Sequence, residues 1–238
     1  VSGGVDSMVL VDLLKKSGLQ FSIAHCNFKL RGKESDNDEL FVKKFSLKNG
    51  IPLHTKSFNT NLRKYSTQMA ARELRYDWFK NVLKNEKMNY VLTAHHLDDS
   101  LETFFLNMTR STGIDGMLGI SNQNKYKIRP LTIYSKREIL DYAKKNRLIW
   151  KEDSSNKSNK YLRNKIRNEI IPLFKEINPE FLNIFKKTTD FLTNSRNLIH
   201  HYIQKLKSKG FKENQNKEIL IDKDFINKNK ESVYYIFR

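Results

Sequence analysis

Short apolar runs alternate with segments of helical periodicity along the first half of the chain. By length and composition the predicted strands are residues 21–26, 51–58 and 90–94. The predicted helices are residues 9–16, 35–50, 68–87 and 98–111. Strands that alternate with helices predict an α/β fold, in which helices cover both faces of a parallel sheet and ligands bind at the carboxyl ends of the strands.

The pattern changes after Pro172, where the chain becomes helical and strongly basic. Residues 181–210 have the periodicity of one or two helices. We predict a boundary near residue 190, with a first domain at 1–190 and a helical, basic segment at 191–238. Because a βα unit needs a strand before Ser2, and because the last residues resemble the middle of an element, we expect the first strand to be missing from a longer protein.

The charge of the chain is large and unevenly distributed. Lys and Arg number 44 against 26 Asp and Glu, which gives a net charge of +18. Residues 1–124 contribute +4 of this charge and residues 125–238 contribute +14. A field of this kind attracts phosphate backbones, so the asymmetry favours a nucleic acid as the partner, although biased lysine usage on solvated faces would give a similar composition.

The composition also bears on the compartment. Hydrophobic residues make up 38% of the chain, enough for a core, but no apolar run approaches the roughly 18 residues of a membrane span. A membrane partner is therefore not expected. The single cysteine, Cys26, cannot form an internal disulfide, which favours a cytoplasmic location and a place for Cys26 in the core.

The segment SGGVDS at residues 2–7 places two glycines directly before the first predicted helix. Backbone N–H groups of a glycine turn and a helix N-terminus form an anion site, and Gly3 and Gly4 let a phosphate approach the main chain. Ser2 and Ser7 add hydroxyl donors. Asp6 would repel a phosphate unless it holds Mg²⁺ that bridges to the phosphates. A plain turn, with Asp6 as a helix cap, is the alternative interpretation.

This segment, with Val5 at the variable position, closely resembles the SGGxDS pyrophosphate loop of the N-type ATP pyrophosphatases. Members of that family cleave ATP between the α and β phosphates and adenylate a substrate oxygen. The resemblance implies ATP and Mg²⁺ as cofactors, ATP binding by Ser2, Gly3, Gly4, Val5, Asp6 and Ser7, and Asp6 as the Mg²⁺ ligand.

Further segments resemble one group within that superfamily, the tRNA(Ile)-lysidine synthases, over roughly residues 1–190. Phe28 departs from the pattern, since many members have histidine there, and we assign it no role; Ser100 stands in place of a glutamine. The matching segments are AHCNFKLRGKESDNDE (24–39), QMAAR (68–72), TAHHLDDSLET (93–103), RSTGIDGMLGI (110–120), RPL (129–131), KREI (136–139), EDSSN (152–156) and LRNKIRNEIIPLF (162–174).

The resemblance implies an ATP-dependent ligation. The C2 oxygen of the wobble cytidine in an isoleucine tRNA is adenylated, and free L-lysine then displaces AMP to give lysidine. The implied partners are that tRNA and free lysine, and residues 191–238 would begin a tRNA-binding region. A homodimer is the default expectation for the oligomeric state.

The resemblance also implies catalytic roles for Asp6, Arg72, His95 and Asp99. Arg72 ends the QMAAR segment, in which family members contact the nucleotide. His95 and Asp99 are four residues apart at a strand-to-helix junction, so both would face the nucleotide if the helix begins there. A carboxylate or an imidazole can hold the lysine ammonium and accept its proton before attack.

Arg163 and Arg167 share a helical face through their i, i+4 spacing. The matched arginines of the family contact substrate or tRNA, and the resemblance implies that role here. A solvated basic face is the alternative interpretation, and it is the one we favour for His200 and His201.

Three other interpretations stay open. A zinc site at His95, His96, Asp98 and Asp99 would lack a cysteine or a distant histidine pair. A tRNA thiolase of the same superfamily would rely on paired cysteines, whereas this chain has one. A module that holds ATP without turnover would release no pyrophosphate.

Overall fold

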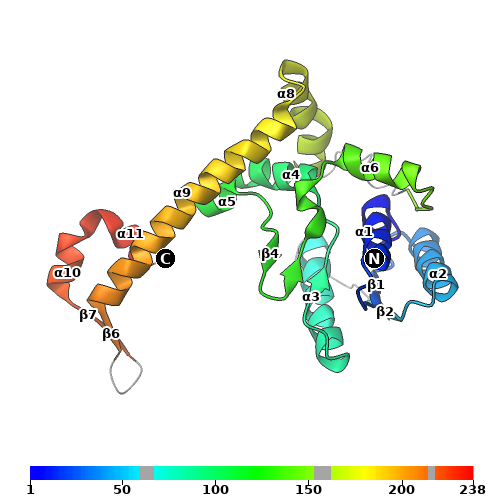
Figure 1. Cartoon of the computed structure of the whole chain (residues 1–238), viewed down its shortest axis with the longest axis horizontal. Helices are drawn as coiled ribbons and strands as arrows, with labels where there is room; N and C mark the ends of the chain where they lie inside the picture. The colour runs from blue at the N-terminus through cyan, green and yellow to red at the C-terminus, as the bar shows by residue number, and fades with distance from the viewer. Residues whose placement is uncertain (59–66, 153–161, 214–217, 238) are drawn as a thin grey trace.

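The computed structural model describes residues 1–58, 67–152, 162–213 and 218–237. It consists of a larger unit, a long helix that leads away from it, and a smaller unit at the far end of that helix (Figure 1). Residues 153–156 of the EDSSN segment lie outside the described residues.

The first part of the larger unit is a βα arrangement around two parallel strands. Strands β1 (Ile23–Asn27) and β2 (Leu53–Ser57) pair in parallel, with Ile23 opposite Leu53. Helices α1 (Val5–Lys16) and α2 (Lys33–Lys48) pack on them through Val11, Ile23 and Val42. Gly50, at φ +63°, directly follows α2 and its C-cap, as predicted. The long helix α3 (Thr67–Asn85) follows in the chain.

The second part of the sheet is shorter and mixed. Strands β3 (Val91–Leu92) and β5 (Lys127–Ile128) are parallel, and β4 (Gln123–Asn124) pairs antiparallel with β5. The strand predicted at 90–94 is thus two residues long, because the chain beyond it turns toward the next helix. Helices α4 (Leu97–Met108), α5 (Ile114–Met117) and α6 (Lys136–Lys145) complete this part.

Two apolar clusters fix α4 and α6 beside the first loop. One joins α1 to α6, which explains why the start of the chain and residues near 140 are neighbours. The other joins α4 to the helices α7 (Leu162–Lys165), η3 (Ile166–Ile170, a π-helical turn) and α8 (Ile171–Ile177). The buried members of the first are Val5, Val9, Leu10, Leu131, Ile139 and Ala143; those of the second are Leu97, Leu101, Ile166, Ile171 and Phe185.

Helix α9 (Phe181–Gly210) is one continuous helix of 30 residues. The boundary predicted near residue 190 falls inside it and stays a prediction. At its far end lie an antiparallel hairpin of β6 (Phe211–Glu213) and β7 (Ile219–Ile221) and the short helices α10 (Lys223–Lys228) and α11 (Val233–Ile236). The hairpin was not expected from the sequence, which we interpreted as helical throughout this segment.

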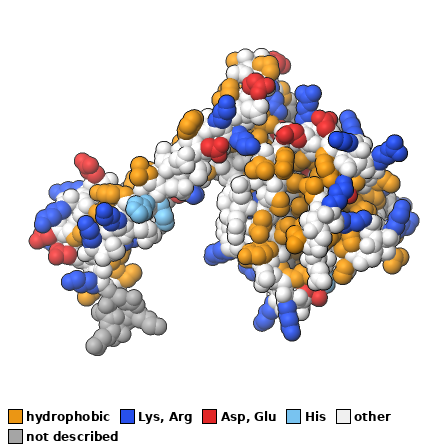
Figure 2. Space-filling view, viewed as in Figure 1, with side chains coloured by type: hydrophobic (Ala, Val, Ile, Leu, Met, Phe, Trp, Pro, Cys, Tyr) orange, Lys and Arg blue, Asp and Glu red, His pale blue; other side chains and the backbone are white. Residues whose placement is uncertain are grey.

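The predicted α/β class is confirmed, with parallel strand pairs, surrounding helices and a helical C-terminal part. Lys and Arg side chains are spread over both lobes on the face that Figure 2 shows. None of the helices in the described ranges combines the length and apolar character that a membrane span requires.

Candidate active site

The loop at residues 2–4 runs directly into the N-terminus of α1. Gly3 has φ +92°, and a Cβ at this position would lie 3.3 Å from the ring of Phe41. Ser7 Oγ donates to Gly4 O at 2.8 Å, and Gly4 N donates to Ser2 Oγ at 3.3 Å. The loop thus has the left-handed glycine and the helix N-terminus that the sequence predicts, and its binding of a phosphate stays a prediction.

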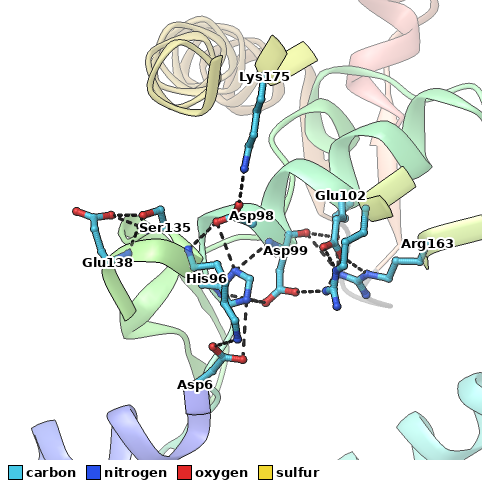
Figure 3. Close-up of polar contacts among 12 residues, drawn as sticks. Asp6, His96, Asp98, Asp99, Glu102, Ser135, Glu138, Arg163 and Lys175 are labelled. Carbon is cyan, nitrogen blue, oxygen red and sulfur yellow. Dashed lines mark hydrogen bonds and ion pairs between the residues drawn. The ribbon is translucent and has the colours of Figure 1, made fainter. Parts of the chain in front are cut away.

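Asp6, in the first turn of α1, faces a lysine and a histidine from other elements. Its Oδ1 lies 2.5 Å from Lys136 Nζ, and its Oδ2 lies 3.9 Å from His96 Nε2 (Figure 3). Within the described ranges, no cluster of three or more His, Cys, Asp or Glu side chains could hold a metal ion. Asp6 nevertheless fits Mg²⁺, because this ion is commonly bound by one or two carboxylates together with substrate phosphates.

The N-terminus of α4 is closed by a reciprocal cap between His96 and Asp99. Asp99 N donates to His96 Nδ1 at 3.3 Å, and His96 N donates to Asp99 Oδ2 at 3.1 Å. His96 is 5% exposed. Burial raises the pKa of Asp99, but His96, its backbone N–H, His95 and Arg163 outweigh that effect, so the pKa is lowered and the carboxylate stays charged.

Asp98 points to the side of α4 that faces α6 and α8. Its Oδ2 accepts a hydrogen bond from Lys136 N at 2.7 Å, and its Oδ1 lies 3.1 Å from Lys175 Nζ (Figure 3). Asp98 therefore links three elements that are distant in sequence.

Glu102 is the most buried charged group of the site, at 1% exposure, and it binds both predicted arginines. Arg163 Nε donates to Glu102 Oε2 at 2.8 Å, and Arg167 Nε donates to Glu102 Oε1 at 2.5 Å. Arg167 Nη2 also lies 3.4 Å from Asp99 Oδ1. The two arginines do share a face, but they point toward α4, so their predicted contact with substrate or tRNA remains a prediction.

These groups surround a cavity of about 890 Å³ between α1, α4, α6 and α8, which we call the loop cavity. Its polar lining mixes acids and bases from segments far apart in sequence. The charged members with His96 are Asp6, Arg31, Asp38, His96, Asp98, Asp99, Glu102, Lys136, Lys151, Glu152, Arg167, Lys175 and Glu176.

Three predicted site residues, Arg72, His95 and Arg163, line a different and smaller cavity of about 230 Å³. Because α4 begins at Leu97 with His96 as its cap, His95 precedes the helix, and the i, i+4 relation to Asp99 does not bring both side chains into the loop cavity. Burial lowers the pKa of His95 to about 4, helped by Arg129, Arg72 and Arg163 and opposed by Asp99. His95 is therefore neutral near pH 7.

Sequence reasoning assigned no site role to Lys136, considered His96 only for the zinc alternative, and considered Glu102 only as a neighbour of the His95 and Asp99 pair. The sequence features that could have indicated these residues were weak. His96 is the N-cap three residues before Asp99, and Glu102 follows Asp98 at helical spacing. The zinc interpretation finds no suitable cluster in the described part of the chain. Burial raises the pKa of the Cys26 thiol to about 11, which fits a place at the edge of the core and not a reactive role.

The glycine loop before α1, the parallel strands and the carboxylates at the start of α4 are the features of a PP-loop fold. A model of the PP-loop domain family matches residues 1–174, and the chain belongs to this family. Membership implies the use of ATP.

The relatives narrow the comparison to one group within that family. A tRNA(Ile)-lysidine synthase from Bacteroides thetaiotaomicron is 40% identical over 213 residues, which cover 88% of this chain and 50% of that protein. One from Chlorobaculum tepidum is 39% identical and covers 74% of this chain and 56% of its own length. The chain thus spans about half the length of the relatives it matches.

A solved structure shares the fold at low sequence identity. The U34-tRNA thiolase of Methanococcus maripaludis superposes with a TM-score of 0.64 and 19% identity, covering 81% of this chain and 69% of that one. This similarity concerns the fold alone.

Proposed function

We propose that the protein ligates free L-lysine to C2 of the wobble cytidine of an isoleucine tRNA. The observation that carries the proposal is the convergence of the SGGVDS loop, Asp6 and the α4 carboxylates on one cavity. Relatives that bear the name tRNA(Ile)-lysidine synthase match most of the chain, which supports this substrate assignment.

In the first step, the cytidine O2 attacks the α phosphorus of ATP, and the bond from that phosphorus to the bridging oxygen of the β phosphate breaks. The glycine loop and the first turn of α1 bind the departing pyrophosphate through backbone N–H groups. Mg²⁺ on Asp6 would neutralise the phosphate charge when bound. Lys136, now paired with Asp6, supplies a second positive charge at the same place.

In the second step, the lysine Nζ attacks C2 of the adenylated base, and AMP leaves with the former O2. The loop cavity offers an ammonium group the carboxylates of Asp98, Asp99 and Glu102. The pKa of Asp99 is lowered, which suits a carboxylate that stays ionised and orients the ammonium. The carboxylates of the loop cavity are also the groups available to accept the proton of the ammonium, since His95 lines the smaller cavity beside Arg72.

The proposed tRNA partner is consistent with the basic second half of the chain, which carries +14 of the total +18. Helix α9, which leads away from the larger unit (Figure 1), carries six Lys and Arg residues against one Asp. A cytoplasmic location and a homodimer belong to the same proposal.

The function is tested with labelled lysine and two isoleucine tRNA transcripts that differ at the wobble position, C or U. Incorporation only into the C transcript, with AMP and pyrophosphate released in equal amounts, is expected. ATP cleavage without lysine incorporation would point to another base modification on this fold. ATP binding with no pyrophosphate release would favour the alternative that the chain is a module that binds ATP without turnover.

A further inference from the structure

The smaller cavity differs from the loop cavity in the charge of its lining. It is lined by Arg72, Arg110, Arg129 and Arg163 together with His95, Thr103, Leu106, Asn107 and Ile120. No Asp or Glu of the described ranges is among them. We call it the arginine cavity.

Of these four arginines, only Arg163 has its charge matched by a carboxylate in the part of the chain that the structure describes, through Glu102 at 2.8 Å. Arg72 lies over the ring of Tyr76, at 5.3 Å from its centroid. Arg110 is exposed at the rim of the cavity. The arginine cavity therefore holds several positive charges with no matching negative charge among the residues described.

Arg129 is the least expected member, because it is only 7% exposed. Its Nη1 donates to Ser121 O at 2.5 Å, while its Nε is buried and has no hydrogen-bond partner in the described residues. A buried guanidinium group with an unused donor is costly unless a ligand supplies the acceptor. Arg129 itself lines the arginine cavity, which is large enough for one small anionic group.

The neighbouring titratable groups respond to the same positive field. The pKa of Lys127 is lowered by burial and then by Arg72 and Arg129. The pKa of His95 is lowered to about 4 by burial and then, against Asp99, by three of the arginines. Both lowered pKa values mean that an added positive charge is disfavoured here, as expected for a site that binds an anion.

We propose that the arginine cavity binds an oxyanion, either a phosphodiester of the RNA strand beside the target base or the carboxylate of the free amino acid. Guanidinium groups match both of these groups through paired N–H donors. The inference rests on the proposed function and assigns roles to Arg110 and Arg129. It also places Arg72 at this oxyanion and not in the loop cavity.

The test uses Arg110→Gln in the full-length protein, because Arg110 is exposed and its loss leaves the Glu102 cluster intact. Lys48→Gln on α2 is the matched control, since it removes one exposed positive charge elsewhere. Three ligands are measured by equilibrium binding without turnover: a 17-nucleotide anticodon stem-loop RNA, L-lysine and ATP. A fourth probe, inorganic phosphate, is followed through the melting temperature.

If the oxyanion is an RNA phosphate, Arg110→Gln weakens RNA binding by about tenfold while lysine binding is unchanged. Replacement of the phosphates beside the target cytidine by neutral methylphosphonates should then weaken RNA binding by the wild type by a similar factor. The same replacement should cause no further loss of RNA affinity in Arg110→Gln. If the oxyanion is the amino-acid carboxylate, lysine binding weakens by about tenfold, and 1,5-diaminopentane binds both proteins equally. Arg110→Lys keeps the positive charge but not the paired N–H donors of the guanidinium group, so it should lose less RNA or lysine affinity than Arg110→Gln.

Loss of ATP affinity alone would overturn the inference, since the cavity would then belong to the nucleotide site. Equal binding of RNA, lysine and phosphate by Arg110→Gln and Lys48→Gln would also overturn it. Because these measurements need no turnover, they remain valid if the wild type fails to incorporate lysine, which would contradict only the proposed function.

Discussion

Both cavities lie beside α4 and take lining residues from it, yet their charged side chains are arranged differently. In the loop cavity, Asp6 faces Lys136, Asp98 faces Lys175, and Glu102 faces Arg167. In the arginine cavity, Arg72, Arg110 and Arg129 have no matching carboxylate in the described residues. The first cavity is close to neutral without ligands, and the second is not.

The difference suits the two cavities beside α4 to different ligands, cations in the loop cavity and anions in the arginine cavity. A neutral, mixed cavity can exchange an internal cation for Mg²⁺ or an ammonium with little change in total charge. A cavity of unmatched arginines gains stability only when an anion arrives, by the ordinary coupling of binding to folding. Glu102 stands between them, since Arg167 lines the loop cavity and Arg163 lines the arginine cavity.

The largest effect is expected from Asp6→Asn, which removes the carboxylate but not the shape of the loop cavity. Loss of the proposed Mg²⁺ ligand should lower ATP-dependent pyrophosphate release by about 1000-fold, or roughly 4 kcal/mol of transition-state stabilisation. RNA affinity, which we attribute elsewhere, should stay within twofold. Asp12→Asn, on the same helix but paired with Lys16, is the control. Turnover near the wild-type rate would exclude the metal role.

Glu102→Gln tests the wall between the cavities. Two guanidinium groups lose their common carboxylate, and each keeps about a third of its side chain exposed, which moderates the cost. The free energy of unfolding should fall by about 2–3 kcal/mol, measured by urea denaturation. Glu86→Gln, at an exposed position of the chain, should change it by less than about 0.5 kcal/mol. Equal stability of the two variants would mean that Glu102 does not hold the wall together.

The burial of His95, with a smaller contribution from the nearby arginines, predicts a dependence of stability on pH. Its pKa falls from 6.5 to about 4 on folding, so between these values the unfolded chain binds a proton that the folded chain does not. Stability is complete above pH 6.5 and falls as the pH is lowered, by up to about 1.4 kcal/mol per pH unit. Urea unfolding at pH 7 and pH 5.5 should show a smaller loss for His95→Gln than for the wild type. Identical losses would indicate that His95 keeps its ordinary pKa.

The smallest effect is expected from Lys175→Gln at the loop cavity. The lysine side chain is 40% exposed, and Asp98 keeps its hydrogen bond from Lys136 N. The free energy of unfolding should change by less than about 1 kcal/mol, as for most exposed ion pairs. Lys187→Gln, on the exposed side of α9, provides the comparison. A cost above 2 kcal/mol would mean that the loop cavity depends on each of its ion pairs.

The sequence predicted the parts of the site that depend on local geometry. The SGGVDS loop stands before a helix with Gly3 in the left-handed region, and Arg163 and Arg167 do share a face. Both follow from spacing within a few residues, which periodicity describes well.

The features that the sequence did not predict depend on contacts between distant residues, on the exact start of a helix, or on very short strands. Glu102 lies some 60 residues from Arg163, so spacing gave no sign of the pair. His95 and Asp99 would share a helical face only if the helix began at His95. Helix α4 begins two residues later, at Leu97, because His96 is its N-cap. The hairpin of β6 and β7 was missed because strands of three residues in a lysine-rich stretch carry too little alternation to be recognised.

Helix α9 has buried side chains near its two ends, Phe185 at one and Ile203 and Leu206 at the other, whereas Phe191 and Leu198 between them are more than 70% exposed. From Phe185 to Ile203 the helix axis rises by about 27 Å. The helix is therefore packed into a core near each end, and between the two cores Arg196 Nη1 lies 3.9 Å from Asp115 Oδ1 of α5. The hairpin begins at Phe211, about 39 Å from Phe185 along the axis, so a tilt of about 10° at Phe185 would displace it by about 7 Å. A small repacking beside α4 would thus become a larger displacement of the C-terminal unit.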